Sequence, residues 1–355
     1  MEEYMLMKGN EAIAEAAIRA GTDGYFGYPI TPQSEVMEYL TLAKPHERTG
    51  MVVLQAESEV ASINMLYGGA AAGKKVMTSS SSPGISLMQE GISYIAGAEL
   101  PCLVVNVVRG GPGLGTIQPS QSDYFQATKG GGHGDYRLIT LAPSSVQEMA
   151  DFVEDAFNLA FKYRNPVMIL TDGAIGQMME KVKFKPQKKR DDASPEWATV
   201  GKPPDRKPNI ITSLDLDPAR HERHNIKLQK KYREIEQKEV RFETIHCDDA
   251  EYLFIAYGTS SRICLKSIQL ARQEGIKVGL FRPISLWPFP YETIRSFTSQ
   301  VKGMLSVEMS SGQMVEDVKL AVDGQIKVDH YGRMGGIIPT PEEIVTALKE
   351  KIIGG

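Results

Sequence analysis

Apolar runs of strand length alternate with amphipathic stretches of helix length through the first half of the chain, and this alternation restricts the fold more than any other feature. The predicted strands lie at residues 25–26, 51–54, 76–78, 102–108, 137–141 and 166–171. Strands joined by connections of helix length run parallel, so the pattern predicts an α/β fold with a doubly wound parallel sheet. The run from Cys102 to Val108 is almost continuously apolar, which is typical of a strand covered on both faces.

Start and stop signals mark the helices between these strands. The predicted helices cover residues 10–21, 58–72, 85–96 and 145–163. Asn10 is expected to cap the first helix and Gly21 to end it, because a short polar side chain suits an N-cap and glycine suits the residue after a helix. The spacing Ser145-x-x-Glu148 predicts a capping box, and the serines of residues 79–82 predict a polar turn.

The composition changes at residue 181 and again after residue 246. Residues 181–246 are rich in charged side chains and proline, which predicts a connector containing one long charged helix at about residues 218–241. Alternation then resumes, so we expect domains at residues 1–180 and 247–355, the second being a smaller α/β domain. Arg282–Pro290 holds three prolines and is predicted to be a rigid connection.

Charge and cysteine content exclude several classes of protein. The net charge is −4 and basic residues form no dense stripe, so we expect no nucleic-acid partner. No apolar stretch reaches the ~20 residues that span a bilayer, and the acidic start of the chain is unlike a secretory signal, which favours the cytoplasm. Cys102, Cys247 and Cys264 are far apart, so neither a disulfide framework nor an iron–sulfur site is expected on this chain.

Polar segments follow four of the predicted strands. They are Tyr28–Pro32, Gln55–Glu59, Ser79–Ser82 and Arg109–Gly115. Ligands of open parallel sheets bind beyond the carboxyl ends of the strands, so these segments are the candidate site.

Glu59 and Arg109 each allow two interpretations. Glu59 begins a predicted helix, where its charge either stabilises the helix dipole or bonds a nitrogen heterocycle and favours its protonated form. Arg109 is either a solvated residue at the end of a strand or a planar fork that holds a carboxylate. The glycines after Arg109 favour the second interpretation, because backbone without side chains lets a substrate approach closely.

Three other motifs give only weak evidence for a ligand or metal site. The loop Gly111–Gly115 fits neither the dinucleotide fingerprint nor the Walker loop, and Gly134-Asp135 precedes a strand where a metal–diphosphate motif should follow one. His221 and His224 have the spacing of two metal ligands on a helix, but the residues around them favour solvated side chains.

Five motifs follow one another along the chain. They are Tyr28-Pro-Ile-Thr-Pro32; Glu57-Ser-Glu59 with Gly68, Gly69 and Gly73; Ser82-Pro-Gly84 with Leu87, Met88 and Glu90; Arg109-Gly-Gly-Pro112; and Trp287-Pro-Phe-Pro290. Together they resemble the alpha subunits of the 2-oxoacid:ferredoxin oxidoreductases. The resemblance covers nearly the whole chain and is weakest in the charged connector.

The resemblance implies a thiamine diphosphate enzyme that is active only with partner subunits. The first domain would have the pyrimidine-type thiamine diphosphate-binding fold, and the second would be similar to the C-terminal domain of transketolase. Glu59 would be the catalytic carboxylate that bonds N1′ of the aminopyrimidine, with Pro29 and Ser81 beside the cofactor. Thr31 and Tyr28 would contact the 2-oxoacid.

The same resemblance assigns the remaining chemistry. Arg109 would hold the carboxylate of the 2-oxoacid until carbon dioxide leaves. A beta subunit would carry the diphosphate and Mg²⁺ site, and [4Fe-4S] clusters would lie on partner chains. Gamma and ferredoxin-like delta subunits, ferredoxin and coenzyme A complete the expected partners, with a homodimer as an option for the isolated chain.

The loop at residues 109–123 looks most similar to the branched-chain type, which acts on 2-oxoisovalerate (3-methyl-2-oxobutanoate). A 2-oxoglutarate enzyme is the second hypothesis, since Lys129 or Arg137 could bind a distal carboxylate. Two further hypotheses stay open: a thiamine-dependent decarboxylase or transketolase-like fragment that passes no electrons, and a non-catalytic structural or regulatory subunit of the same complex.

Overall fold

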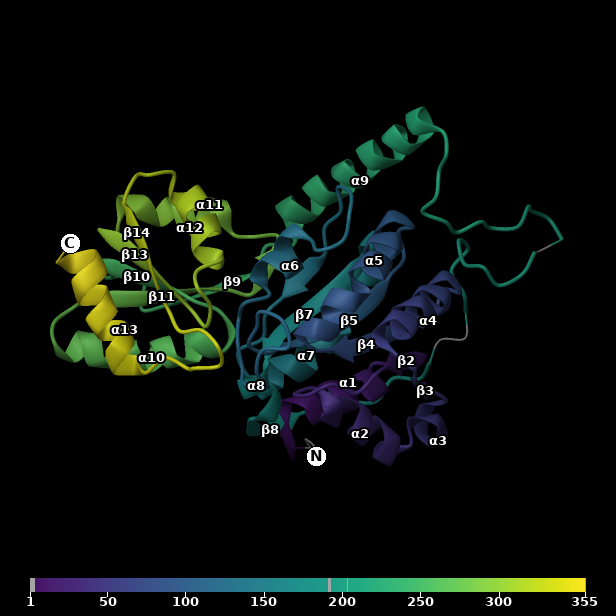
Figure 1. Ribbon diagram of the computed structural model, residues 1–355, viewed down its shortest axis with the longest axis horizontal. Coiled ribbons are helices and arrows are strands. Elements are labelled where there is room, and N and C mark those ends of the chain that lie inside the picture. The colour runs from purple at the N-terminus through teal and green to yellow at the C-terminus, as the bar shows by residue number, and fades with distance from the viewer. Residues whose placement is uncertain (1–3, 191–192, 203, 355) are drawn as a thin grey trace.

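The computed structural model describes residues 4–190, 193–202 and 204–354, which form two α/β bodies joined by a long helix (Figure 1). A seven-stranded sheet forms the centre of the first body. In spatial order its strands are β12 (Ser285–Trp287), β6 (Ile139–Leu141), β7 (Pro166–Asp172), β5 (Cys102–Val108), β4 (Val76–Ser80), β2 (Gly24–Gly27) and β3 (Val52–Gln55). All neighbours run parallel except β12 and β6. The predicted doubly wound sheet is therefore confirmed.

Helices cover both faces of this sheet. The helices of the first body are α1 (Gly9–Arg19), α2 (Ser34–Ala43), α3 (Pro45–Thr49), α4 (Glu59–Ala71), α5 (Ser82–Gly97), α6 (Tyr124–Lys129), α7 (Val146–Tyr163) and α8 (Gly173–Gln177). Apolar side chains of α1, α2 and α7 pack in one core cluster, and those of α4 and α5 pack in another. Among the described residues, no helix combines the length and the hydropathy needed to cross a membrane.

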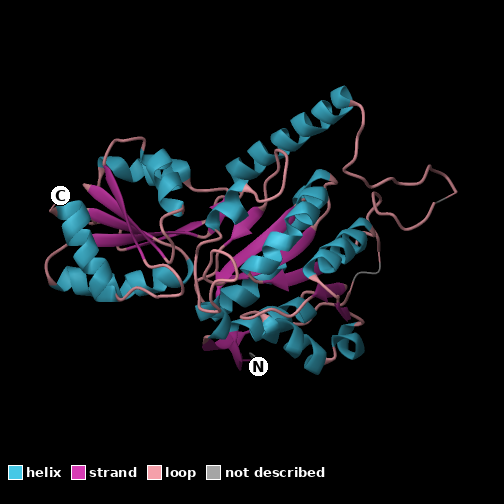
Figure 2. Ribbon diagram, viewed as in Figure 1, coloured by secondary structure: helices cyan, strands magenta, loops and turns pink. Residues whose placement is uncertain are grey.

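The second body has a five-stranded sheet, and it shares a core with the first. Its strands are β14 (Lys327–Gly332), β13 (Gly303–Glu308), β10 (Tyr252–Ile255), β11 (Val278–Pro283) and β9 (Phe242–Ile245), and its helices are α10 (Gly258–Gln273), α11 (Tyr291–Ser296), α12 (Met314–Val322) and α13 (Pro341–Leu348). Figure 2 shows the two sheets as separate groups of strands. The cluster that covers α4 and α5 continues into this body, where the rings of Tyr124 and Tyr257 lie 6.0 Å apart.

The charged connector contains α9 (Pro218–Lys238), which confirms the predicted long helix. Its few buried side chains, Leu228, Tyr232 and Ile235, pack on the first body. The same segment also supplies strands that were not predicted: β8 (Met179–Lys183) overlaps its start and pairs with β1 (Tyr4–Lys8), and β9 at its end joins the second sheet.

Three local predictions were wrong. Lys8, not Asn10, is the N-cap of α1, and Asn10 is buried with its amide bonded to Pro32 O at 2.6 Å. Ser145 caps α7, but Glu148 turns to Ser144 and does not complete the capping box. Residues 79–80 belong to β4 rather than to a turn. Residues 282–290 are not helical, as their prolines predicted, and they contain β12, an antiparallel edge strand of the first sheet.

Candidate cofactor and substrate site

Four polar segments follow adjacent parallel strands and therefore meet at one edge of the first sheet. Tyr28–Pro32 follows β2, Glu57–Glu59 follows β3, Ser81 follows β4 and Arg109 follows β5. In parallel strands the carboxyl ends share an edge, so these segments border one region of the molecule. The six residues expected in the site are distributed over these segments.

Glu59 is the first residue of α4 and is 6% exposed. Ser58 caps the helix, its Oγ accepting a hydrogen bond from Ala61 N at 3.2 Å. No described residue donates a hydrogen bond to the Glu59 carboxylate. A carboxylate held near the positive end of a helix, with no partner of its own, is suited to bonding a ligand.

Gly84 packs directly against Glu59 and Ser80. A Cβ atom on Gly84 would lie 2.7 Å from Glu59 Oε1 and closer still to Ser80 Oγ. Gly84 lies in the first turn of α5, so α5 approaches the end of α4 without a side chain between them. The carboxylate and the hydroxyl therefore converge on the same small space.

Unpartnered polar atoms gather at this edge. Among the described residues, five buried atoms on β4, β5 and the residues just after them have no hydrogen-bond partner. They are Thr78 Oγ1, Ser80 Oγ, Ser81 Oγ, Asn106 Oδ1 and Arg109 Nε. A buried polar atom left unpaired costs about 1–3 kcal/mol, so such a group of atoms indicates a place that bonds a ligand.

A buried chain of hydrogen bonds holds the Tyr28–Pro32 segment. Gln33 Nε2 donates to Tyr28 O at 3.0 Å, and Gln33 Oε1 accepts from Ser79 Oγ at 2.7 Å. Ser79 in turn lies 2.9 Å from the hydroxyl of Tyr25, whose pKa burial raises to about 12, so that this phenol stays protonated. Gln33 was not among the predicted site residues, although its place directly after the proline of the motif was a signal.

The side chains of this segment face different surroundings. Tyr28 and Pro29 are half-buried, whereas Thr31 is exposed. Asn10 Nδ2 and Gln177 Nε2 both donate to Pro32 O, at 2.6 and 3.3 Å. The end of the segment is thus fixed from the opposite side of the sheet edge, while Thr31 remains accessible.

Arg109 joins two loops. Its Nη1 donates to Thr31 O and its Nη2 to Leu114 O, each at 3.0 Å. Its backbone N donates to Ser82 Oγ at 3.1 Å. The half-buried guanidinium is therefore fixed between the Tyr28–Pro32 segment and the glycine loop, and it retains N–H groups that a carboxylate can accept from.

The two cations considered for a distal carboxylate lie elsewhere. Lys129 Nζ donates to both oxygens of Asp317, at 2.6 and 2.8 Å. Arg137 and Lys129 line a separate cavity of about 580 Å³ together with Trp287 and Tyr291. Neither side chain is brought to the sheet edge that carries Arg109 and Glu59.

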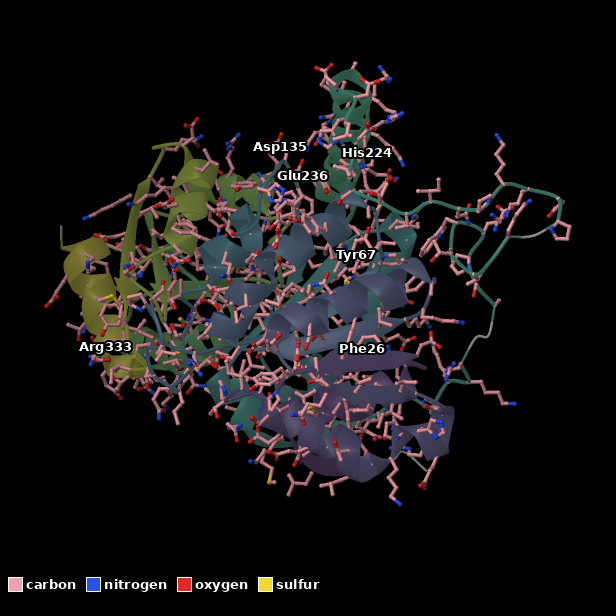
Figure 3. All side chains as sticks on the ribbon, turned by 45° about the vertical axis from the view of Figure 1, so that its right-hand side comes forward. Phe26, Tyr67, Asp135, His224, Glu236 and Arg333 are labelled. Atoms are coloured by element: carbon pink, nitrogen blue, oxygen red, sulfur yellow. The ribbon has the colours of Figure 1, made fainter. Side chains whose placement is uncertain are left out.

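The histidine pair on α9 is also remote from the sheet edge. His224 Nε2 bonds Gly97 O at 2.7 Å, and Figure 3 shows His224 on α9, away from Phe26 of β2. Within the described ranges, no three metal-binding side chains are grouped so that they could hold an ion.

Two family models cover most of the chain. The model described as pyruvate flavodoxin/ferredoxin oxidoreductase, thiamine diphosphate-binding, matches residues 15–245. The model described as pyruvate:ferredoxin oxidoreductase core domain II matches residues 250–344.

Individual relatives match over nearly their full length. The ketoisovalerate oxidoreductase subunit VorB of Methanothermobacter thermautotrophicus is 50% identical over 97% of both chains. The 2-oxoglutarate synthase subunit KorA of the same organism is 36% identical over 98% of both chains.

Solved structures agree on the fold. A 2-oxoglutarate:ferredoxin oxidoreductase from Magnetococcus marinus, with 2-oxoglutarate, coenzyme A and succinyl-CoA bound, superposes with a TM-score of 0.85 at 30% identity. This match covers 99% of the present chain and 66% of that one. A split-gene transketolase superposes with a TM-score of 0.61 at 13% identity, which shows a shared fold alone.

Proposed function

Because the chain belongs to the thiamine diphosphate-binding 2-oxoacid:ferredoxin oxidoreductases, we propose that it is the pyrimidine-side subunit of an enzyme acting on 2-oxoisovalerate. The reaction would be oxidative decarboxylation to an acyl-CoA, with carbon dioxide released and ferredoxin reduced. The single observation that carries the proposal is the Glu59 carboxylate at the start of α4, which lies against Gly84 and to which no described residue donates a hydrogen bond.

The residues at the sheet edge fit the pyrimidine half of thiamine diphosphate. Glu59 would accept a hydrogen bond from a ring nitrogen, and Ser81, whose buried hydroxyl has no partner, would bond the ring substituents. Pro29 would supply apolar contact from the neighbouring segment. Gly84 carries no side chain, so α5 lies close to Glu59 and Ser80 without displacing either group.

When bound, the cofactor supplies the carbon nucleophile that attacks the 2-oxoacid. The chain's own part is to hold and move protons and to orient the substrate. Glu59 would hold the ring in the tautomer that can remove a proton, since a carboxylate stabilises positive charge on the nitrogen it contacts. Arg109 would bind the substrate carboxylate through its remaining N–H groups, with Thr31 and Tyr28 beside the rest of the substrate.

An apolar substrate side chain agrees with the charges near the site. Lys129 is bonded to the buried Asp317, and Arg137 lines a different cavity, so neither supports a second substrate carboxylate. The relative at 50% identity is a ketoisovalerate oxidoreductase subunit, whereas the 2-oxoglutarate synthase subunits are at 34–37%. We therefore favour 2-oxoisovalerate and keep 2-oxoglutarate as the second candidate.

Partner subunits would complete the enzyme. We propose a beta subunit that holds the diphosphate and Mg²⁺, and further gamma and delta subunits with iron–sulfur clusters that pass electrons to ferredoxin. The matching relatives are a ketoisovalerate oxidoreductase subunit and a 2-oxoglutarate synthase subunit, which supports a multi-subunit enzyme. Large apolar side chains on α4 and α5 also support a partner on this side: Val60, Met65, Leu87 and Tyr94 are 37–55% exposed.

Replacing Glu59 by Gln in the assembled complex tests the proposal. We expect coenzyme A-dependent viologen reduction to fall by about 10²–10⁴-fold, the range for loss of a positioned acid–base group. Glu57→Gln is the matched control, because Glu57 is an exposed glutamate two residues away. Unchanged turnover in E59Q would contradict the proposed role.

A substrate panel tests the choice of 2-oxoacid. The wild-type complex would be assayed with 2-oxoisovalerate, 2-oxoglutarate and pyruvate in parallel, each with coenzyme A. We expect the highest kcat/KM with 2-oxoisovalerate. A preference for 2-oxoglutarate would move the assignment to the second candidate, and release of carbon dioxide without viologen reduction would indicate a decarboxylase.

A further inference from the structure

We propose that Gln121 is a positioning residue, which anchors the glycine loop Arg109–Gly115 to the second body and thereby holds Arg109 in the site. This inference rests on the proposed function, because it concerns how the substrate carboxylate is held. Gln121 itself makes no hydrogen bond to Glu59 or to Arg109. Its effect would pass through the backbone between residues 109 and 121.

Gln121 directs its polar groups at the second body. Its Nε2 donates to Tyr257 O at 2.8 Å, and its Oε1 accepts from Ser260 Oγ at 2.6 Å and from Met309 N at 2.9 Å. Its backbone N donates to Met309 O at 2.9 Å, and its backbone O accepts from the Tyr257 hydroxyl at 3.3 Å. The side chain is 2% exposed, so these bonds form where water does not compete.

The residues beside Gln121 are bonded to the same body. Ser120 Oγ donates to Met309 O at 3.1 Å, while Gln313 Nε2 donates to Ser122 O at 2.7 Å. Gln313 Oε1 also accepts from Phe125 N at 2.8 Å. The segment at residues 120–125 is therefore fixed as a unit on the second body, with Gln121 as its most heavily bonded member.

A short path leads from this segment to Arg109. Arg109 and Pro119 form an isolated antiparallel bridge, and Gly110 N donates to Gln118 O at 2.9 Å. The second body also touches the stem of the loop, because a Cβ on Gly336 would collide with Gln118 Cβ. The base of the glycine loop is thus held between β5 and the second body.

The tip of the loop has little else to hold it. Residues 111–115 are exposed, and Leu114 is 82% exposed. A cavity of about 360 Å³ lies beside them, bordered by Gly111, Asp123, Ser310 and Met334 among others. The three glycines in residues 111–115 give the tip wide conformational freedom, so the position of the tip depends on the anchored stem.

The position of this loop matters because Leu114 O accepts a hydrogen bond from Arg109. If the loop moves, Arg109 loses one of its two backbone acceptors and keeps only Thr31 O. A guanidinium with one anchor samples more orientations, so it is less often placed to donate to the substrate carboxylate. Weaker binding of the 2-oxoacid is the direct consequence.

Gln121→Ala in the assembled complex tests this inference. We expect KM for 2-oxoisovalerate to rise about tenfold with kcat changed much less, as for loss of an interaction made equally in ground and transition state. Amide hydrogen exchange of residues 110–118 should also become faster. Ser260→Ala removes only the bond to Gln121 Oε1, so a smaller rise in the same direction is expected.

Arg262→Met is the matched control. Arg262 also joins the two bodies, through Ser144 O at 3.0 Å and Glu180 at 2.8 Å, but it makes no bond to residues 109–123. It should lower the unfolding temperature without changing KM or exchange in the loop. Equal effects of Q121A and R262M on KM would mean that Gln121 only stabilises the junction.

The outcomes separate this inference from the proposed function. If the wild-type complex turns over and E59Q does not, but Q121A and S260A both leave KM unchanged, the positioning role is wrong and the function stands. If the wild-type complex oxidises no 2-oxoacid, the proposed function fails first. Should Q121A not assemble, S260A and the exchange measurement decide.

Discussion

The carboxyl edge of the first sheet and the junction between the two bodies are both buried and polar, but they differ in how their polar groups are paired. At the sheet edge, Thr78, Ser80 and Ser81 keep buried hydroxyls without partners, and no described residue donates to the Glu59 carboxylate. At the junction, Gln121 uses both its amide oxygen and its amide nitrogen.

Ion pairs extend the contrast. Arg282 of β11 is 4% exposed and bonds Glu148 of α7 through two nitrogens, at 2.7 and 2.8 Å. Asp317 of α12 likewise accepts from Lys129 and Tyr124, which lie on α6. Charges buried between the bodies are therefore paired on both sides of the boundary.

The difference distinguishes residues whose polar groups stabilise the fold from residues whose polar groups are available to bond a ligand. A buried polar atom without a partner lowers stability, whereas a paired one is close to neutral or favourable. Removing polar groups should thus have opposite effects in the two regions. Substitutions at the junction should destabilise the fold, and those at the sheet edge should cost function more than stability.

The largest effect on stability is expected at Arg282. Replacing it by Met removes the cation that pairs with Glu148 and Glu243. Because these two carboxylates are 25% and 46% exposed, the loss should lie at the lower end for a buried pair, about 3 kcal/mol. The free energy of unfolding of the isolated chain, measured by urea denaturation, would show the loss. As a control, Arg220→Met removes an exposed pair with Asp215 and should leave stability unchanged.

Acid should reduce the difference between R282M and the wild type. Burial raises the pKa of Glu148, but the hydrogen bond and charge of Arg282 outweigh it, so the pKa lies below its ordinary value. The stabilisation is therefore present above the unfolded pKa of about 4.3 and is lost as the pH falls through the folded pKa. A stability difference that stayed constant between about pH 5 and about pH 2 would contradict this pairing.

Gly84→Ala tests the close contact of Gly84 with Glu59 and Ser80 at the sheet edge. The added Cβ would press on Ser80 Oγ and Glu59 Oε1, so we expect thiamine diphosphate affinity of the assembled complex to fall more than tenfold. Overpacking should also cost about 1–3 kcal/mol of stability. Calorimetric titration with the cofactor and urea denaturation would measure the two effects.

Gly68→Ala supplies the control for the glycine substitution. Gly68 lies within α4, and a Cβ there would meet nothing within 4 Å. Alanine favours the helix over glycine by about 0.8–1.0 kcal/mol, so the isolated chain should become more stable. If Gly84→Ala behaved like Gly68→Ala and bound cofactor normally, the sheet edge beside Gly84 would not be the cofactor site.

Local patterns predicted the elements well because hydrophobic periodicity reflects which faces are buried. The strand at residues 102–108 and the helix that begins at Glu59 were predicted from such patterns. Residues 79–80 were predicted to be a turn because serine is polar, yet they lie in a buried strand, where Ser79 Oγ donates to Gln33 and Ser80 Oγ lies near Gly84 and Glu59. The polar character that misled the prediction is the same property that marks the ligand edge.

Long-range partners explain what the sequence could not predict. Asparagine often caps helices, but the side-chain amide of Asn10 is bonded to Pro32 O across the fold. The importance of Gln121 depends on Ser260 and Met309, more than a hundred residues away. No local pattern reports such contacts, so the candidate site was predicted by resemblance and position while its supports were not.

The smallest predicted effects give the sharpest test of the comparison, because they differ in sign. Thr78→Val replaces a buried hydroxyl that has no partner by a methyl group of similar shape, so the unfolding free energy should rise by about 1 kcal/mol. Ser260→Ala removes a hydroxyl that donates to Gln121 Oε1 at 2.6 Å, so the unfolding free energy of this variant should fall by about 1 kcal/mol. Both are single-hydroxyl deletions at fully buried positions, and urea denaturation under one set of conditions would resolve them. Two losses of equal size would mean that the hydroxyls at the sheet edge serve stability like those at the junction, and the physical distinction between the two regions would no longer hold.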